Sequence, residues 1–157
     1  SIGATVLATT RRENNRELLR NQGADAALIE NGLIWEQVRE LYPTGVNKIL
    51  ELIGPATLHE SLSLVRFHGI VCVTGILGKR GTLTDFYPIK DIPSGVYLTG
   101  FSSNSPTQQV MNDIFNHMKT HNLRARIGQI FSLEEIGQAH ELMEHNEARG
   151  KVVIKIC

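Results

Sequence analysis

The sequence lacks the features of a secreted, membrane-spanning or nucleic-acid-binding protein. Two cysteines in 157 residues are too few for a disulfide framework, and Cys72 lies in an apolar run typical of a buried strand. Lys and Arg together number 16, as do Asp and Glu, so the basic excess of nucleic-acid binders is missing. The longest apolar run, residues 69–77, is much shorter than the ~20 residues that span a bilayer. Residues 1–4 lead directly into a strand rather than a signal peptide, so we expect a cytoplasmic protein that binds neither nucleic acid nor membrane.

The sequence does contain an alternation of short β-branched runs with amphipathic helical stretches. One strand and one helix together occupy about 25 to 30 residues, which is the βαβ spacing of a doubly wound parallel sheet. We therefore predict an α/β fold of the Rossmann type, with one helix beginning at Pro55 and a long loop over residues 76–93. The predicted strands are residues 5–9, 26–29, 46–53, 69–74, 96–101 and 151–156.

Three sequence signals place helix ends. Gly23 follows a helix predicted over residues 13–22, at the position where glycine commonly ends a helix. Residues 105–108 combine a capping serine, a first-turn proline and a capping-box glutamine, and residues 132–135 form a second capping box. The helix that follows the cap at Ser105 carries an apolar stripe of Met111, Ile114, Phe115 and Met118.

The glycine loop that opens a dinucleotide-binding domain is absent from this sequence. Such domains begin with a strand, then G-x-G-x-x-G, then a helix, whereas the first strand here ends in Thr9-Thr10-Arg11-Arg12. We interpret it as the second strand of the motif, which leaves the central first strand missing. Strands 5–9 and 46–53 should then present unpaired edges, with residues 151–156 as one candidate to fill the gap. This chain alone should not bind NADPH tightly, because the glycine loop holds the pyrophosphate.

The residues that end the predicted second strand select between the two nicotinamide cofactors. An acid there binds the ribose hydroxyls of NAD, whereas a neutral residue followed by arginine accommodates the 2′-phosphate of NADP. Thr10 is neutral, and Arg11 and Arg12 carry the planar guanidinium groups that match a phosphate. This pattern favours NADP(H). The alternative is that the two arginines simply begin a solvated helix.

Other polar residues carry weaker signals. His117 and His121 have the spacing to share a helix face but lack the Glu of an H-E-x-x-H zinc motif, so we interpret them as surface histidines and predict no metal site. The remaining histidines accompany no nucleophile or carboxylate arrangement. Glu51 lies within a predicted strand, where we expect a buried carboxylate whose hydrogen-bonding partners are present.

Five segments carry a family resemblance: GATVLATTR at residues 3–11, LL and GAD within 18–25, VNKILELIG at 46–54, GIVCVTG at 69–75, and F-x-LEEI, AH, ME and GKVV within 131–153. In this order they resemble the medium-chain dehydrogenase/reductase superfamily and, within it, the zinc-free, NADPH-dependent quinone oxidoreductases. The specificity of the resemblance lies in the order and spacing of the segments, which cover essentially the whole chain.

The resemblance implies a cofactor site at the carboxyl ends of the parallel strands. It implies that residues 1–124 form a partial dinucleotide-binding domain and that residues 125–157 complete a GroES-like substrate domain. It places the substrate-orienting residues and any zinc ligands outside this sequence, so we assign no catalytic residue. The alternative for Leu52, Ile53 and Ile76 is core packing. The implied cofactor-binding residues are Thr10, Arg11 and Arg12 at the adenosine phosphate, Leu52, Ile53 and Gly54 along the ribose, Thr74, Gly75 and Ile76 at the nicotinamide riboside, and Gly100, Phe101 and Ser102 at the carboxamide.

The resemblance also implies a function and an assembly. The implied function is that of the C-terminal part of an oxidoreductase, inactive alone, that transfers a hydride from NADPH to a quinone, enone or other carbonyl acceptor. The alternatives are the cofactor domain of a zinc-dependent alcohol dehydrogenase and a non-catalytic binding or structural module. In the family, strand 96–101 is an edge that pairs with its copy, and here it has no charge or proline to prevent pairing, so we expect a homodimer.

Overall fold

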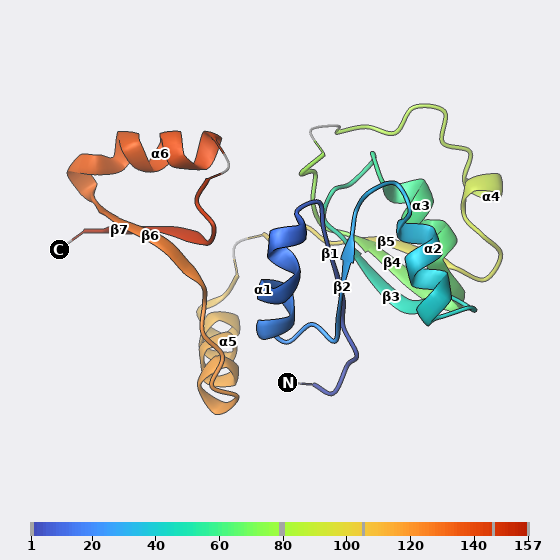
Figure 1. Cartoon of the computed structure of the whole chain (residues 1–157), viewed down its shortest axis with the longest axis horizontal. Helices are drawn as coiled ribbons and strands as arrows, with labels where there is room; N and C mark the ends of the chain where they lie inside the picture. The colour runs from blue at the N-terminus through green and yellow to red at the C-terminus, as the bar shows by residue number, and fades with distance from the viewer. Residues whose placement is uncertain (1, 79–80, 105, 146, 157) are drawn as a thin grey trace. The chain divides into compact units, whose positions relative to one another are not determined.

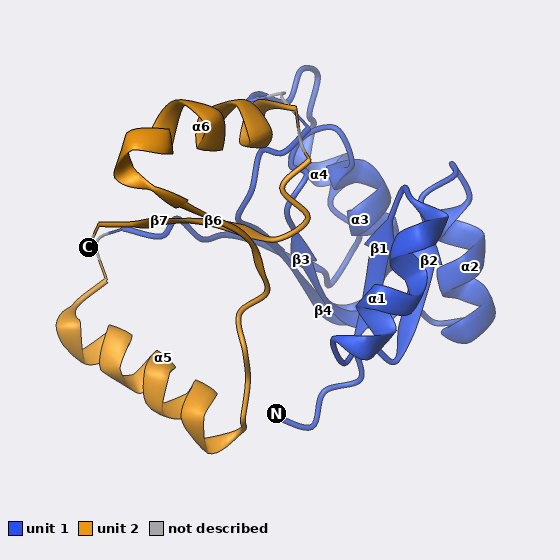
Figure 2. Cartoon of the chain, turned by 60° about the vertical axis from the view of Figure 1, so that its left-hand side comes forward, with its two compact units in different colours: residues 1–105 blue, residues 106–157 orange. Residues whose placement is uncertain are grey.

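A computed structural model describes residues 2–78, 81–104, 106–145 and 147–156 (Figure 1). The chain divides into two compact units, residues 1–105 and residues 106–157 (Figure 2). This division lies before the helix at Gln108–Thr120, whereas the sequence places a domain boundary after residue 124. The assignment of the C-terminal segment to a substrate domain stays a prediction.

The first unit contains parallel strands in two separate sheets. Strand β1 (Leu7–Thr10) pairs with β2 (Ala26–Ile29). Strands β3 (Val46–Glu51), β4 (Val65–Val73) and β5 (Tyr97–Gly100) form the second sheet in the order β3-β4-β5. Parallel neighbours need crossover connections, and helices supply most of them. This arrangement confirms the predicted α/β fold of the Rossmann type.

Strands β1 and β3 are not hydrogen-bonded to each other, so within the described residues each has one edge without a partner strand. The sequence predicts this gap, because the first strand of the motif is absent from it. The two sheets are nevertheless joined through side chains, because Leu7 of β1 and Ile49 of β3 pack against the same buried cluster. That cluster is formed by Leu28, Ile34, Val38 and Leu64.

Helices α2 (Ile34–Leu41) and α3 (Leu58–Leu64) supply most of the core beside the sheets. Ile34 and Val38 are one turn apart and both buried, as expected for an amphipathic helix. The helix predicted to begin at Pro55 begins at Leu58 and is followed directly by β4, whose first residue, Val65, is buried. A second buried cluster is formed by Leu58, Leu62, Val65 and Val71.

Strand β4 begins at Val65, before the predicted strand 69–74, and its pairing with β3 contains an irregularity. Its register against β3 shifts between Val46 and Lys48. Near this point His68 adopts a positive φ of 62°, and its backbone N–H donates to the carbonyl of Gly95 at 2.8 Å. The strand therefore runs through a bulge that the sequence pattern does not predict.

Two other elements of the first unit differ from prediction. A 3-10 turn, η1 (Glu13–Asn15), and helix α1 (Arg16–Asn21) replace the single predicted helix, and Gly23 follows them with a φ of 101°, as expected for a helix end. The predicted loop over residues 76–93 contains a short helix, α4 (Pro88–Asp91). Helices α1 and α2 lie on opposite sides of the β1–β2 pair (Figure 1).

The second unit contains a parallel strand pair covered by a helix (Figure 2). Strand β6 (Ile127–Ser132), which the sequence did not predict, pairs with β7 (Lys151–Lys155). Residues 151–156 therefore do not fill the gap between β1 and β3. Between the two strands come the turn η2 (Leu133–Glu135) and helix α6 (Ile136–Glu144). The predicted capping box is confirmed, since the N–H of Ser132 donates to the Glu135 carboxylate at 2.8 Å.

Helix α5 (Gln108–Thr120) begins later than predicted. Its cap is Thr107, whose hydroxyl oxygen accepts a hydrogen bond from the N–H of Val110 at 3.3 Å. The predicted cap, Ser105, lies outside the described residues, and Gln108 binds Asn112 instead of closing a capping box. In the apolar stripe, Met111 and Met118 are half-buried, while Ile114 and Phe115 are exposed.

Candidate cofactor-binding site

Three loops emerge together at the carboxyl ends of β3, β4 and β5. The strand register aligns Glu51 with Val73 and Val73 with Gly100. The N–H of Phe101 continues the pairing by donating to the carbonyl of Val73 at 2.9 Å. The structure therefore brings together most of the predicted cofactor-binding residues, which are Leu52, Ile53, Gly54, Thr74, Gly75, Ile76, Gly100, Phe101 and Ser102.

The loops after β3 and β4 touch through their backbones at two glycines. Gly54 has a φ of 89°, which residues with a side chain rarely adopt. A Cβ added there would lie 2.6 Å from the carbonyl oxygen of Gly75, and a Cβ on Gly75 would collide with the backbone of Leu52. Glycine at the end of β4 thus permits the close backbone approach of the two loops.

Backbone hydrogen bonds hold these two loops together. The N–H of Leu77 donates to the carbonyl of Leu52 at 3.1 Å, and the N–H of Gly78 donates to the carbonyl of Ile53 at 2.9 Å. The strand pairing therefore continues beyond the strands themselves, and the edge of the sheet is a defined surface rather than a set of independent loops.

Beneath this surface lies the buried carboxylate of Glu51, which is 4% exposed. Its Oε1 accepts hydrogen bonds from the N–H of Ile53 at 2.8 Å, the N–H of Gly54 at 3.0 Å and the hydroxyl of Thr57 at 3.0 Å. Its Oε2 accepts a short hydrogen bond from the hydroxyl of Ser61. The prediction of a buried carboxylate with its partners present is confirmed.

Large apolar side chains are exposed at the same sheet edge. Leu52, Ile53 and Ile76 are 45%, 37% and 66% exposed, so none of them belongs to the buried core of this chain. Leu77 and Phe101 are exposed as well. Exposed apolar groups gathered at one place are typical of a binding surface.

The predicted adenosine end, Thr10 to Arg12, follows β1 in the other sheet. The hydroxyl oxygen of Thr10 accepts hydrogen bonds from the N–H of Arg12 at 3.2 Å and the side-chain amide of Asn15 at 3.4 Å. Arg11 and Arg12 are exposed, and neither forms an ion pair with any residue that the structure describes. Their guanidinium groups are therefore available for an anion, although their position just before η1 also fits a solvated helix start.

The described residues do not fit a metal centre. No group of three or more His, Cys, Asp or Glu residues within the described ranges could hold a metal ion. His117 lies in the last turn of α5 and His121 directly follows the helix; their ring centroids are 4.3 Å apart, and both residues are exposed. Among the helices that the structure describes, none is long and apolar enough to cross a membrane.

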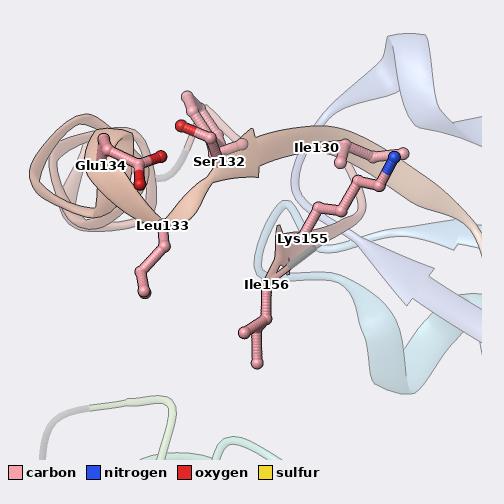
Figure 3. Close-up of a pocket in the computed structure, with 7 residues that line it drawn as sticks. Ile130, Ser132, Leu133, Glu134, Lys155 and Ile156 are labelled. Atoms are coloured by element: carbon pink, nitrogen blue, oxygen red, sulfur yellow. The ribbon is translucent and has the colours of Figure 1, made fainter.

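A separate hollow of about 360 Å³ lies in the second unit (Figure 3). Among its lining residues, Leu133 and Ile156 project to the same side (Figure 3), and Lys155 lines it as well. The pKa of Glu134, which also lines the hollow, is lowered because its own backbone N–H and the hydroxyl of Ser132 donate to the carboxylate. The hollow lacks the glycine contacts and the arginine pair of the surface described above.

A family model described as zinc-binding dehydrogenase matches residues 11–154 of this chain. The chain belongs to the zinc-binding dehydrogenase family. It is thus a member of the medium-chain dehydrogenase/reductase superfamily, with quinone oxidoreductases among its relatives. The resemblance of its sequence segments to this superfamily is confirmed.

Individual proteins with similar sequences or structures match nearly the whole chain. The quinone oxidoreductase of the pig, Sus scrofa, is 27% identical, over 98% of this chain and 48% of its own length. The crystal structure of AibC has a TM-score of 0.84 and 27% identity, over 97% of this chain and 42% of that one. A mycobacterial protein solved in complex with NADPH has a TM-score of 0.76 and 21% identity, over 99% of this chain and 50% of that one. The chain spans about half the length of the curated relatives it matches.

Sequence reasoning did not identify the donors that hold Glu51. A signal for them exists, because Thr57 and Ser61 are four residues apart after Pro55 and so share one face of the predicted helix. Two hydroxyls on the buried face of an otherwise apolar helix indicate a buried acceptor opposite them.

Proposed function

We propose that this chain is the C-terminal part of an oxidoreductase that transfers a hydride from NADPH to a quinone, enone or other carbonyl acceptor. The observation that carries the proposal is the defined surface at the carboxyl ends of β3, β4 and β5, where backbones meet at Gly54 and Gly75 and apolar side chains are exposed. The nicotinamide would supply the hydride when bound, and the protein would orient it. The relative from the pig is a quinone oxidoreductase, which supports the class of acceptor.

The preference for NADP(H) rests on Thr10, Arg11 and Arg12. The strand ends in a neutral residue, and both guanidinium groups are free of ion pairs with described residues. The mycobacterial neighbour that was solved with NADPH supports the same cofactor.

Three further proposals follow from the family and the sequence. The residues that orient the substrate lie outside this chain, so the chain alone is inactive. The protein is a homodimer joined through β5. It is located in the cytosol, as its cysteine usage indicates.

The test uses the full-length enzyme that contains this chain. We expect NADPH to be oxidised in the presence of benzoquinone, faster than NADH, without any added metal. Loss of reduced-cofactor absorbance measures both rates. Oxidation of an alcohol that stops when zinc is chelated would support the alcohol dehydrogenase alternative. Binding of NADPH without turnover of any carbonyl acceptor would support the non-catalytic module.

A further inference from the structure

Glu51 is a buried acid that no part of the proposed hydride transfer uses. Placing a charged carboxylate where it is 4% exposed is costly unless hydrogen bonds replace its hydration. Among the described residues, its donors all come from a single stretch of chain, the loop after β3 and α3. The carboxylate therefore organises one specific loop rather than the core in general.

The hydrogen bonds define how this loop is bent. Oε1 draws the N–H groups of Ile53 and Gly54 inward, which turns the chain back on itself where Gly54 has its positive φ. Thr57 and Ser61 tie the same carboxylate to α3. The loop can therefore move only if α3 moves or the hydrogen bonds break.

Glu51 also connects the loop to β4. Its backbone carbonyl accepts a hydrogen bond from the N–H of Thr74 at 3.0 Å. The turn that its side chain shapes places Gly54 directly against Gly75. One residue thus contacts both loops that the proposed function assigns to the nicotinamide half of the cofactor.

We propose that Glu51 is a positioning residue for the nicotinamide end of the cofactor. It acts through the Ile53–Gly54 turn, since a side chain 4% exposed is not available to the cofactor itself. This inference rests on the proposed function, because it presupposes a nicotinamide cofactor at this edge.

The position of the adenosine end provides the contrast needed for a test. Thr10, Arg11 and Arg12 follow β1, and β1 has no hydrogen bond to β3 in the described part of the chain. A loss of the Glu51 contacts should therefore leave the adenosine end intact. General unfolding, by contrast, would damage both ends.

The experiment measures dissociation constants of the full-length enzyme for NADPH and for adenosine 2′,5′-bisphosphate, which carries the adenosine end only. Glu51→Ala should weaken NADPH about tenfold or more, as misplacement of a binding group does, and leave the bisphosphate within about twofold. Glu51→Gln should bind NADPH nearly as well as the wild type, because its amide oxygen still accepts at the turn and its amide N–H can donate to Ser61. Glu36→Ala, an exposed glutamate of α2, is the matched control and should change neither constant.

If Glu51→Ala does not fold, Thr57→Val and Ser61→Ala each remove one donor and should weaken NADPH severalfold with the bisphosphate unchanged. Equal weakening of both ligands by these variants, or of neither, would overturn the role of Glu51 and leave the proposed function intact. A wild-type enzyme that binds the bisphosphate but gains nothing from the nicotinamide half would overturn both.

Discussion

The two sheets of the first unit differ in how far their binding edges are prepared in advance. At β3, β4 and β5 the loops are linked by backbone hydrogen bonds, close glycine contacts and the carboxylate of Glu51. At β1 the predicted phosphate-binding side chains, Arg11 and Arg12, extend into solvent with no ion pair to the described residues. The first edge has a defined shape, whereas the second has exposed positive charge.

This difference implies two kinds of binding energy. A preformed surface loses little conformational entropy when a ligand arrives, so its contribution depends on shape. Exposed arginines gain an electrostatic attraction that salt screens over about 8 Å at physiological ionic strength. The nicotinamide end should therefore determine geometry, and the adenosine end should determine which cofactor is chosen.

The largest effect is expected where the two regions should meet. With no glycine loop in the sequence to hold a pyrophosphate, the 157-residue chain should show no micromolar binding of NADPH, although both flanking regions are present. Isothermal titration calorimetry of the purified chain measures this directly. Micromolar affinity would mean that β1 is misinterpreted as the second strand of the motif and that another loop binds the pyrophosphate.

The fixed region should not tolerate a side chain at its glycine contact. Gly54→Ala combines a positive φ with a Cβ placed 2.6 Å from the carbonyl oxygen of Gly75, and should lower the free energy of unfolding by about 2–4 kcal/mol. Urea unfolding followed by circular dichroism measures the change. Gly81→Ala is the control, since a Cβ there meets nothing within 4 Å, and equal stability of the two variants would contradict the fixed contact.

The charged region should respond in cofactor choice. Arg11→Ala with Arg12→Ala should weaken NADPH by about 1.5–3 kcal/mol, roughly ten- to a hundredfold, because a charge-assisted contact to the 2′-phosphate is lost. NADH should be nearly unaffected. Fluorescence titration of the full-length enzyme gives both constants, with Arg20→Ala on α1 as the control. Losses of the same size for both cofactors would reject the phosphate assignment.

The outer edge of the fixed region tests the proposed dimer. Thr99 lies in β5, and a lysine there should weaken pairing between two copies of this edge about tenfold. Light scattering at micromolar concentration should show a dimer for the wild type and a larger monomer fraction for Thr99→Lys. Thr82→Lys, at an exposed position outside the strands, should stay dimeric. A monomeric wild type would rule out this interface.

The smallest expected effect concerns Glu60 of α3, whose pKa depends on charged residues that follow or end strands of both sheets. Its pKa is raised mainly by burial and also by the charges of Glu30 and Glu51, while a hydrogen bond from the N–H of Trp35 opposes the shift. A raised folded-state pKa favours the neutral form, so its stabilising contribution is present below the ordinary value of 4.5 and is lost as pH rises through the folded-state value.

Glu60→Gln should therefore remove this loss of stability with rising pH in the acidic range and slightly raise stability at neutral pH. Thermal unfolding over a pH series measures it, with Glu36→Gln as the exposed control. An unchanged slope would show that Glu60 has the same pKa in the folded and unfolded protein.

Strand identity was predictable from the sequence because buried parallel strands are continuous apolar runs between turn residues. The bounds of β2 match the prediction, and the other strands of the first unit are displaced by a few residues. Strand β6 was missed because four of its six residues are exposed, so neither alternation nor a continuous apolar run marks it. The bulge near His68 was missed because a positive φ at a non-glycine residue depends on tertiary contacts.

The candidate site was predictable only as far as topology determines it. Parallel strands bring their carboxyl ends to one edge, so Leu52, Thr74 and Phe101 were expected to be neighbours. The contact of Gly54 with Gly75 depends on strand register, which composition and spacing do not specify. Whether these residues bind the cofactor is still a prediction, since no part of the fold tests it.

The open edges of β1 and β3 also affect solubility, because an unpaired strand edge can add a strand from another molecule. β3 contains Lys48, and a charge within the strand disfavours such addition. β1 contains only Leu7, Ala8, Thr9 and Thr10, with no charge and no proline. We therefore expect aggregation of the concentrated chain to start at the unpaired edge of β1.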